Sequence, residues 1–259
     1  MGVYAGVDIG SATAKAVVID DATPAVILGT ALIPVGFDSE AAGKAVLEQA
    51  LCEAGLGTEA LERVVTTGYG RHAMAAEAAV TEITCHARGA AELVPEAGSV
   101  IDVGGQDSKA MSLGPGGRVL DFVMNDKCAA GTGRFLEVMA RALEVRLDQF
   151  GPLSLKAERA AEISNTCTVF AESEVISQRA ARTPREEIIA GIHKAMARRI
   201  AGMARRTDLR PVVVMSGGVA RNIGLVRAVE AELGMKVVVP ELAQYAGALG
   251  AALLARERP

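Results

Sequence analysis

The sequence has few aromatic residues: no tryptophan, three tyrosines and five phenylalanines among 259 residues. Half of all residues are apolar, so a sizeable core can still form, but it must be mainly aliphatic. Few rings are left for stacking against nucleic-acid bases. The formal net charge of −4 gives no basic excess for phosphate backbones, and we therefore expect no nucleic-acid partner.

The sequence also lacks any run of 18 apolar residues, and its N-terminus carries no basic segment followed by a long apolar one. These absences predict neither a membrane span nor a secretory signal, so we expect a cytoplasmic protein with no membrane partner. Four cysteines in such a chain are more typical of reduced, metal-binding or core residues than of disulfides.

Two of the cysteines stand directly before segments with a helical pattern. Cys128 lies in a loop of small residues, and from Phe135 an apolar residue recurs every fourth position. Cys167 follows the polar residues 164–166, which are typical of a helix start. The free N–H groups and the positive dipole end at a helix start favour a thiolate and its anionic adducts.

A short polar turn separates two apolar runs near the N-terminus, in the segment Asp8-Ile9-Gly10-Ser11-Ala12-Thr13-Ala14-Lys15. This pattern predicts two strands whose turn of small residues lets backbone N–H groups approach a phosphate. Asp8, at a strand end, could hold a hydrated magnesium ion. Lys15 either faces the phosphates or is a solvated strand residue, and a plain hairpin also fits.

The same pattern returns 94 positions later in Asp102-Val103-Gly104-Gly105-Gln106-Asp107-Ser108-Lys109-Ala110. Asp102 then corresponds to Asp8, and Lys109 corresponds to Lys15. A duplicated strand–turn–strand unit predicts two similar lobes. Two such hairpins could clamp one nucleotide from opposite sides.

A third candidate site begins with the apolar strand predicted over 211–215. The turn Ser216-Gly217-Gly218 follows it, and then a helix predicted over 223–233. A nucleotide can lie against the backbone of such a strand–turn–helix unit. The loop at 68–71 either approaches the site or is only a turn.

The other two cysteines are assigned to packing. The amphipathic helix predicted over 40–54 includes Cys52 among its apolar positions, so we expect Cys52 in the core. Cys85 and His86 have no second pair at metal-ligand spacing, and we interpret them as helix or packing residues.

Taken in order, these segments resemble the motifs of the actin, hexokinase and Hsp70-like ATPases. Residues 8–11 resemble the phosphate-1 motif, 102–107 phosphate-2, 215–222 the adenosine motif and 247–252 the second connecting motif. The implied fold is α/β, with two duplicated ribonuclease H-like lobes around a nucleotide cleft. The lobes are expected at 1–94, completed by a helix at 241–259, and at 95–240.

The cysteine segments 125–135 and 167–177 resemble the signatures of the 2-hydroxyacyl-CoA dehydratase activators. That family also includes the ATPase subunits of benzoyl-CoA reductase, and the resemblance spans nearly the whole chain. It implies an ATP-hydrolysing homodimer with one interfacial 4Fe–4S cluster, to which each chain gives Cys128 and Cys167. A four-thiolate cluster fits two cysteines per chain and a two-fold axis.

The resemblance further implies that ferredoxin or flavodoxin supplies an electron. ATP hydrolysis would then drive its transfer to a dehydratase, or to the catalytic component of a benzoyl-CoA reductase. Asp8 and Asp102 would serve Mg²⁺ through water, while Gln106 and Asp107 would lie near the γ-phosphate and the attacking water. The residues expected to bind ATP or ADP are Gly10, Ser11, Ala12, Thr13, Lys15, Gly104, Gly105, Gln106, Gly217, Gly218, Asn222 and Gln244.

Two other kinds of function remain open on the residues alone. A small-metabolite kinase of the same fold would make the cysteines incidental, although we find no obvious insertion for binding an acceptor. A nucleotide-dependent interaction protein could instead hold zinc at the cysteines. Zinc would leave the protein colourless, whereas an iron–sulfur cluster would colour it brown.

Overall fold

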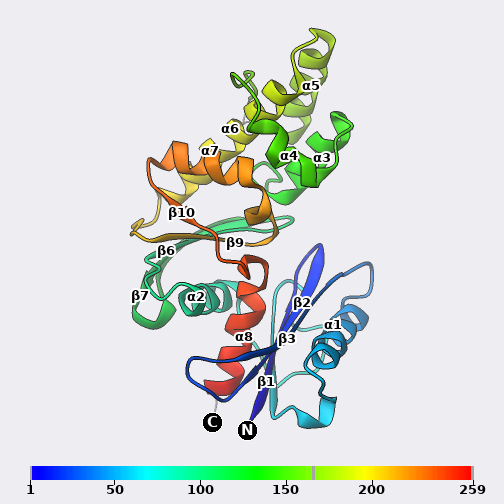
Figure 1. Cartoon of the computed structure of the whole chain (residues 1–259), viewed down its shortest axis with the longest axis vertical. Helices are drawn as coiled ribbons and strands as arrows, with labels where there is room; N and C mark the ends of the chain where they lie inside the picture. Colours follow the sequence, from blue (N-terminus) through cyan, green and yellow to red (C-terminus); the bar gives the residue numbers. More distant parts are fainter. Residues whose placement is uncertain (1, 165–166, 258–259) are drawn as a thin grey trace.

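The computed structural model describes residues 2–164 and 167–257, which form two five-stranded sheets stacked along the long axis (Figure 1). The first sheet has the order β3-β2-β1-β4-β5 and the second β8-β7-β6-β9-β10. The first consists of β1 (Val3–Ile9), β2 (Thr13–Asp20), β3 (Ile27–Pro34), β4 (Arg63–Thr67) and β5 (Ala78–Ala79). The second consists of β6 (Ser99–Val103), β7 (Ser108–Gly114), β8 (Arg118–Asn125), β9 (Val213–Ser216) and β10 (Val237–Val238).

The two sheets repeat one another in strand order and direction. In each sheet the first three strands along the chain pair antiparallel. The central strand, β1 or β6, then pairs in parallel with β4 or β9, and this strand pairs in parallel with β5 or β10. The register repeats too, because Asp8 lies opposite Lys15 and Asp102 lies opposite Lys109. The predicted duplication and the two-lobed α/β fold are therefore confirmed.

Helices cover both faces of each sheet (Figure 1). The first sheet packs α1 (Ser39–Glu53) on one face and α8 (Ala246–Glu257) on the other. The second sheet packs α2 (Glu82–Leu93) on the face toward α8. Its opposite face carries the largest core cluster, with α3 (Gly133–Ala142), α4 (Leu147–Ser154), α5 (Thr168–Ala180), α6 (Arg185–Ala204) and α7 (Ile223–Leu233).

The lobes meet where α2 crosses α8, and glycines let the two helices touch backbone to backbone. A Cβ on Gly250 would lie 1.8 Å from the carbonyl oxygen of Cys85, and one on Gly89 would lie 1.9 Å from that of Ala246. No side chain fits at such distances. The small residues of α8, which the sequence placed in a connecting motif, therefore bring the two sheets close together.

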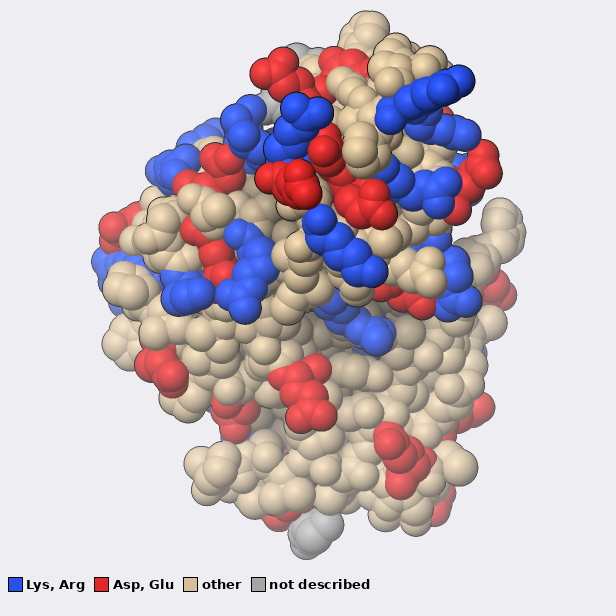
Figure 2. Space-filling model, turned by 45° about the horizontal axis from the view of Figure 1, so that its top comes forward, with Lys and Arg blue, Asp and Glu red and all other residues tan. Residues whose placement is uncertain are grey.

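The structure places charge unevenly. On the face shown in Figure 2, Lys and Arg side chains gather over the upper part of the molecule, interspersed with Asp and Glu, while the lower part is mainly uncharged and its charged side chains are mostly Asp and Glu. Among the described residues, no helix is both long and apolar enough to cross a membrane.

Two expectations about single residues change. The prediction of Cys52 in the core is wrong, because the residue is exposed. Its neighbours Ala50 and Leu51 face the core, and the next residue turns away by about 100° on a helix. Asn165 and Thr166, expected before the second cysteine helix, lie outside the described residues, and α5 is capped by Cys167. The lobe boundaries at 94 and 240 remain a prediction.

We expect Gly250→Ala to destabilise the protein by about 3 kcal/mol, because the added methyl must push α2 and α8 apart. Gly202→Ala is the matched control, since its Cβ on the exposed side of α6 meets nothing within 4 Å. That variant should gain about 0.5–1 kcal/mol, as alanine is the better helix residue. Urea unfolding followed by circular dichroism measures the free energy of unfolding of both variants. Equal values for Gly250→Ala and Gly202→Ala would contradict the close contact of α2 and α8.

Candidate functional site

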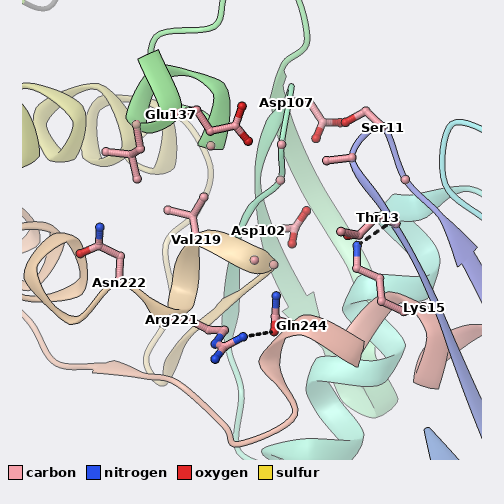
Figure 3. Close-up of a pocket in the computed structure, with 18 of the residues that line it drawn as sticks. Ser11, Thr13, Lys15, Asp102, Asp107, Glu137, Val219, Arg221, Asn222 and Gln244 are labelled. Carbon is pink, nitrogen blue, oxygen red and sulfur yellow. Dashed lines mark hydrogen bonds between the residues drawn. The ribbon is translucent and has the colours of Figure 1, made fainter. Parts of the chain in front are cut away.

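A cavity of about 560 Å³ opens between the two sheets, a size suited to a small-molecule ligand. Residues from both lobes line it, and Figure 3 shows those of the two hairpins facing those of η3 (Gly218–Arg221). All of the residues predicted to bind nucleotide or magnesium line it except Gln106, which is exposed. The predicted residues that line it are Asp8, Gly10, Ser11, Ala12, Thr13, Lys15, Asp102, Gly104, Gly105, Asp107, Gly217, Gly218, Asn222 and Gln244.

The two turns predicted to bind phosphate are residues 10–13, called the first phosphate turn, and residues 104–107, called the second phosphate turn. Both have the same internal hydrogen bond. Gly10 N donates to the carbonyl oxygen of Thr13 at 3.1 Å, and Gly104 N donates to that of Asp107 at 3.0 Å. The turns also approach each other, because a Cβ on Gly105 would lie 3.2 Å from Ser11 Oγ. A ligand at this point would therefore meet backbone N–H groups from both lobes, as an anion-binding site requires.

A buried lysine holds three carboxylates together at the floor of the cavity. Lys109 Nζ lies 2.7 Å from Glu82, 2.7 Å from Asp107 and 3.3 Å from Asp102. The Lys109 side chain is 2% exposed. Lys109 and Glu82 were not among the predicted site residues, although the duplicated pattern matches Lys109 with Lys15. In the first lobe that equivalent pair is looser, with Lys15 Nζ 3.6 Å from Asp8.

The charges in this cluster stabilise one another. Burial alone would raise the pKa of Asp102, but the charges of His86 and Lys109 and a hydrogen bond from Ser216 lower it well below its usual range. Burial alone would lower the pKa of Lys109, but its three carboxylates raise it above its usual range. Asp102 and Lys109 are therefore both charged near neutral pH.

His86 was expected to be a packing residue, but the structure places it in this site. Its side chain lies on α2 and lines the cavity, with Nδ1 3.1 Å from Asp102 Oδ1. Burial alone would lower the pKa of His86, but the charges of Asp102 and Asp8 raise it overall. Metal-ligand spacing could not reveal this role, because the partner of His86 lies on another element.

The opposite end of the cavity is built around Asn222. Its Oδ1 accepts a hydrogen bond from Leu225 N at 3.0 Å, which caps α7. Its Nδ2 lies 3.1 Å from Nε2 of His193. Burial lowers the pKa of His193 to about 3, so the ring is neutral and Nε2 can accept this bond. Arg221 Nη1 donates to Gln244 Oε1 at 3.2 Å beside it (Figure 3).

Helices α3 and α4 form one wall of the cavity, and none of the residues in this wall was predicted from the sequence. Its side chains include Leu136 and Glu137 on α3 and Leu147, Asp148 and Pro152 on α4. The apolar members give a ligand a dry surface beside the polar Asn222 end. A helical apolar pattern alone could not show which of these residues would face a cavity.

Helix α3 is tied directly to the second phosphate turn. Gly133 N and Arg134 N, at the first two positions of α3, donate to the carbonyl oxygens of Gly104 and Gly105, both at 2.8 Å. Most helices leave these first N–H groups without backbone partners. The cavity floor and the helix that follows Cys128 are thus joined by main-chain hydrogen bonds.

Cys128 and Cys167 do not line the cavity, and both are partly exposed. Cys128 lies in the loop before α3, where Asn125 Nδ2 donates to its carbonyl oxygen at 2.9 Å. Cys167 is the N-cap of α5, which packs against α3. Within residues 2–164 and 167–257, no three His, Cys, Asp or Glu side chains form a metal-binding group. Two thiols are half of the four that a 4Fe–4S cluster usually takes.

Comparison with known proteins finds close relatives over nearly the full length. The profile of the BadF/BadG/BcrA/BcrD ATPase family matches residues 5–255. The activator of lactoyl-CoA dehydratase from Anaerotignum propionicum is 49% identical, over 97% of this chain and 96% of that protein. Component A of (R)-2-hydroxyglutaryl-CoA dehydratase from Acidaminococcus fermentans has a solved structure that matches with a TM-score of 0.94 and 42% identity, over 99% of this chain and 98% of that one.

A second solved structure, the activator of the 2-hydroxyisocaproyl-CoA dehydratase from Clostridium difficile, contains bound ADPNP. It matches with a TM-score of 0.92 and 43% identity, over 98% of this chain and 94% of that one. A subunit of the benzoyl-CoA reductase from Thauera aromatica is a more distant relative, 37% identical over 78% of this chain and 73% of that protein.

We expect Lys109→Met to lower the free energy of unfolding by about 3–5 kcal/mol at pH 7, because it leaves the buried carboxylate of Asp107 without its ion-pair partner and takes one partner from Asp102. Without the lysine, burial favours the protonated form of a carboxylate that has lost its partner. Such groups destabilise the folded state above their pKa, and protonation relieves this as the pH falls. The difference in the free energy of unfolding between wild type and Lys109→Met should therefore become smaller as the pH falls from 7 toward 5.

Lys44→Met is the matched control for this prediction. Lys44 is exposed, and its ion pair with Glu40 lies within one helix. Its loss should leave the unfolding midpoint nearly unchanged at either pH. Urea titrations of the three proteins make the comparison, and a Lys109→Met variant as stable as Lys44→Met would contradict the charge cluster.

Proposed function

The chain belongs to the BadF/BadG/BcrA/BcrD ATPase family, and we propose that it is an ATP-hydrolysing activator of a 2-hydroxyacyl-CoA dehydratase. In this role a homodimer holds one 4Fe–4S cluster and passes a single low-potential electron to the dehydratase. The observation that carries the proposal is the pair of hydrogen bonds from α3 to the second phosphate turn. They connect the ATP site to the helix that follows the ligating cysteine.

The nucleotide lies, in this proposal, with its phosphates between the two turns and its adenosine at Asn222. Ser11, Ala12 and Thr13 would hold phosphates from the first lobe, and Gly104 and Gly105 from the second. This orientation is supported by the near contact of the turns and by the apolar wall beside Asn222. The relative that binds ADPNP has the same fold over almost the whole chain.

Asp8 and Asp102 would hold the waters of a magnesium ion between the lobes. Both carboxylates line the cavity, and oxygen ligands of this kind suit Mg²⁺. Asp107 would face the γ-phosphate, because it forms the end of the second turn and is held by Lys109. A role for Gln106 near the γ-phosphate would require its exposed side chain to turn inward when ATP is present. Hydrolysis would then depend mainly on positioning and charge neutralisation.

Cys128 and Cys167 of each chain would supply the four thiolates of the shared cluster. The cluster, when bound, supplies the one-electron redox chemistry that amino-acid side chains lack. Cys167 is the N-cap residue of α5, where the helix dipole favours the negative charge of a thiolate ligand, and Cys128 lies in the loop before α3. Reduced ferredoxin or flavodoxin is the proposed source of the electron.

ATP would act on the cysteines through α3. A shift of the second phosphate turn on ATP binding or hydrolysis must move Gly133 and Arg134, because their N–H groups are bonded to it. The start of α3 packs tightly there, since a Cβ on Gly133 would lie 3.2 Å from Gly104 O and 3.3 Å from Val219. Helix α3 then carries the movement to α5 and its N-cap, Cys167.

A benzoyl-CoA reductase-type ATPase is the second candidate. It shares the family, but the dehydratase activators match a larger share of this chain at higher identity. A small-metabolite kinase of the same fold is disfavoured by the same full-length likeness to activators. Neighbouring genes for dehydratase subunits, rather than reductase subunits, would support the first candidate.

We predict about four irons and four acid-labile sulfides per dimer after anaerobic reconstitution, as a four-thiolate cluster requires. Cys128→Ala should abolish the brown colour and the iron, because each dimer would then lose two of its four ligands. Cys52→Ser is the matched control, since Cys52 is exposed on α1 and should leave the iron content unchanged. An unchanged iron content in Cys128→Ala would show that Cys128 is not a ligand of the cluster.

Arg134→Pro tests the connection through α3. Proline fits the first turn of a helix but removes the N–H that bonds to Gly105. Arg134→Ala is the control, because it removes the same side chain and keeps that N–H. The readout is the rate at which a chelator extracts iron from the protein with ATP or with ADP bound.

We expect the extraction rate to differ between the two nucleotides in wild type and Arg134→Ala. In Arg134→Pro the rates should become similar, while ATP hydrolysis continues. A nucleotide-dependent rate in Arg134→Pro equal to that of wild type would show that the movement takes another route.

A further inference from the structure

His86 lies between the acidic strand ends of the two sheets. It projects from α2, the helix that packs on both the second sheet and α8. Its Nδ1 faces Asp102 of β6 at 3.1 Å. Its Nε2 faces the start of α8, where an added Cβ on Gly247 would lie 2.7 Å from Nε2 and 3.1 Å from Asp8 Oδ2. His86 Nε2 and Asp8 Oδ2 therefore both lie close to Gly247.

The carboxylate of Asp102 is held on both of its oxygens. Oδ1 faces His86 Nδ1 and accepts a hydrogen bond from Ser216 Oγ at 2.9 Å. Oδ2 accepts one from Lys109 Nζ at 3.3 Å. Partners of this kind fix the direction in which a carboxylate presents its remaining lone pairs. Asp8 is held less firmly, with Lys15 at 3.6 Å as its ion-pair partner.

We propose that His86 is a positioning residue that sets the two aspartates, Asp8 and Asp102, at the separation needed to bind hydrated Mg²⁺ with the nucleotide. The imidazole contacts Asp102 through Nδ1 and fills the space before Asp8 with the other side of the ring. In this role His86 acts through the two aspartates and not on the reacting atoms. This role rests on the magnesium–nucleotide site proposed above and does not involve the iron site.

The location of His86 gives the role a mechanical basis. Asp8 belongs to the first sheet and Asp102 to the second, so closure of the lobes changes the distance between them. His86 sits at the crossing of α2 and α8, where the two lobes are in backbone contact. One rigid ring at that crossing keeps the carboxylates from collapsing together or spreading apart. Gly247 is part of this arrangement, because any side chain there would displace the ring.

The test measures ADP affinity with and without Mg²⁺ for the purified full chain, using calorimetry. Wild type should bind ADP more tightly when Mg²⁺ is present. In His86→Ala we expect that gain to fall by about tenfold or more, with metal-free ADP affinity changed by less than about threefold, as removal of a supporting partner of metal ligands predicts. His86→Asn should recover most of the gain, because its amide N–H can replace Nδ1.

His72→Ala is the matched control, since His72 is an exposed histidine outside the cavity, and it should behave as wild type. A purely structural role for His86 predicts that metal-free and magnesium-dependent affinities fall together and that asparagine gives no recovery. That result would overturn the proposal, as would a His86→Ala variant with the full magnesium gain. Absence of any magnesium gain in wild type would overturn the proposed magnesium site, and this role with it.

If His86→Ala does not fold, His86→Asn and His86→Gln replace it. Asparagine places its N–H near the position of Nδ1, whereas glutamine reaches toward that of Nε2. The proposal predicts a larger magnesium gain for asparagine than for glutamine. The reverse order would contradict the contact with Asp102 as the one that matters.

Discussion

The second phosphate turn, residues 104–107, is the point on which the rest of the structure depends. It approaches Ser11 of the first lobe, holds Asp107 against Lys109 and accepts the first two N–H groups of α3. A backbone segment with so many fixed partners cannot move alone. Any ligand that shifts this turn must therefore shift the opposing lobe, the charged floor or α3.

The charge cluster around Lys109 holds this turn in place at the boundary between the lobes. Lys109 joins carboxylates from β6, from the turn and from α2, so three elements share one ammonium group. A buried cluster of this kind adds little net stability compared with an apolar core, but it penalises any arrangement that separates the charges. In the first lobe the equivalent Lys15 lies 3.6 Å from one carboxylate, that of Asp8, and donates a hydrogen bond to the carbonyl oxygen of Thr13, so fewer charges are joined there.

The structural features that could be predicted from the sequence are those formed by residues close together in the chain. The Asp8 and Asp102 hairpins, their duplication and the Ser216–Gly218 turn could each be predicted from a few consecutive residues, and the strand registers follow them. Glu82 and His86 could not, because their partners lie on other strands and only tertiary packing of α2 brings them together. The exposure of Cys52 was missed because a weakly amphipathic alanine-rich helix does not define its buried face sharply.

In the proposed function, ATP hydrolysis drives one electron from a cluster bound by Cys128 and Cys167 to a dehydratase. The most direct measurement mixes the anaerobically reduced protein with a 2-hydroxyacyl-CoA dehydratase and follows the reduced cluster by electron paramagnetic resonance. The account predicts that the signal disappears after addition of MgATP and persists with MgADP or without the dehydratase. Loss of the signal at the same rate with either nucleotide, or no loss with MgATP, would contradict it.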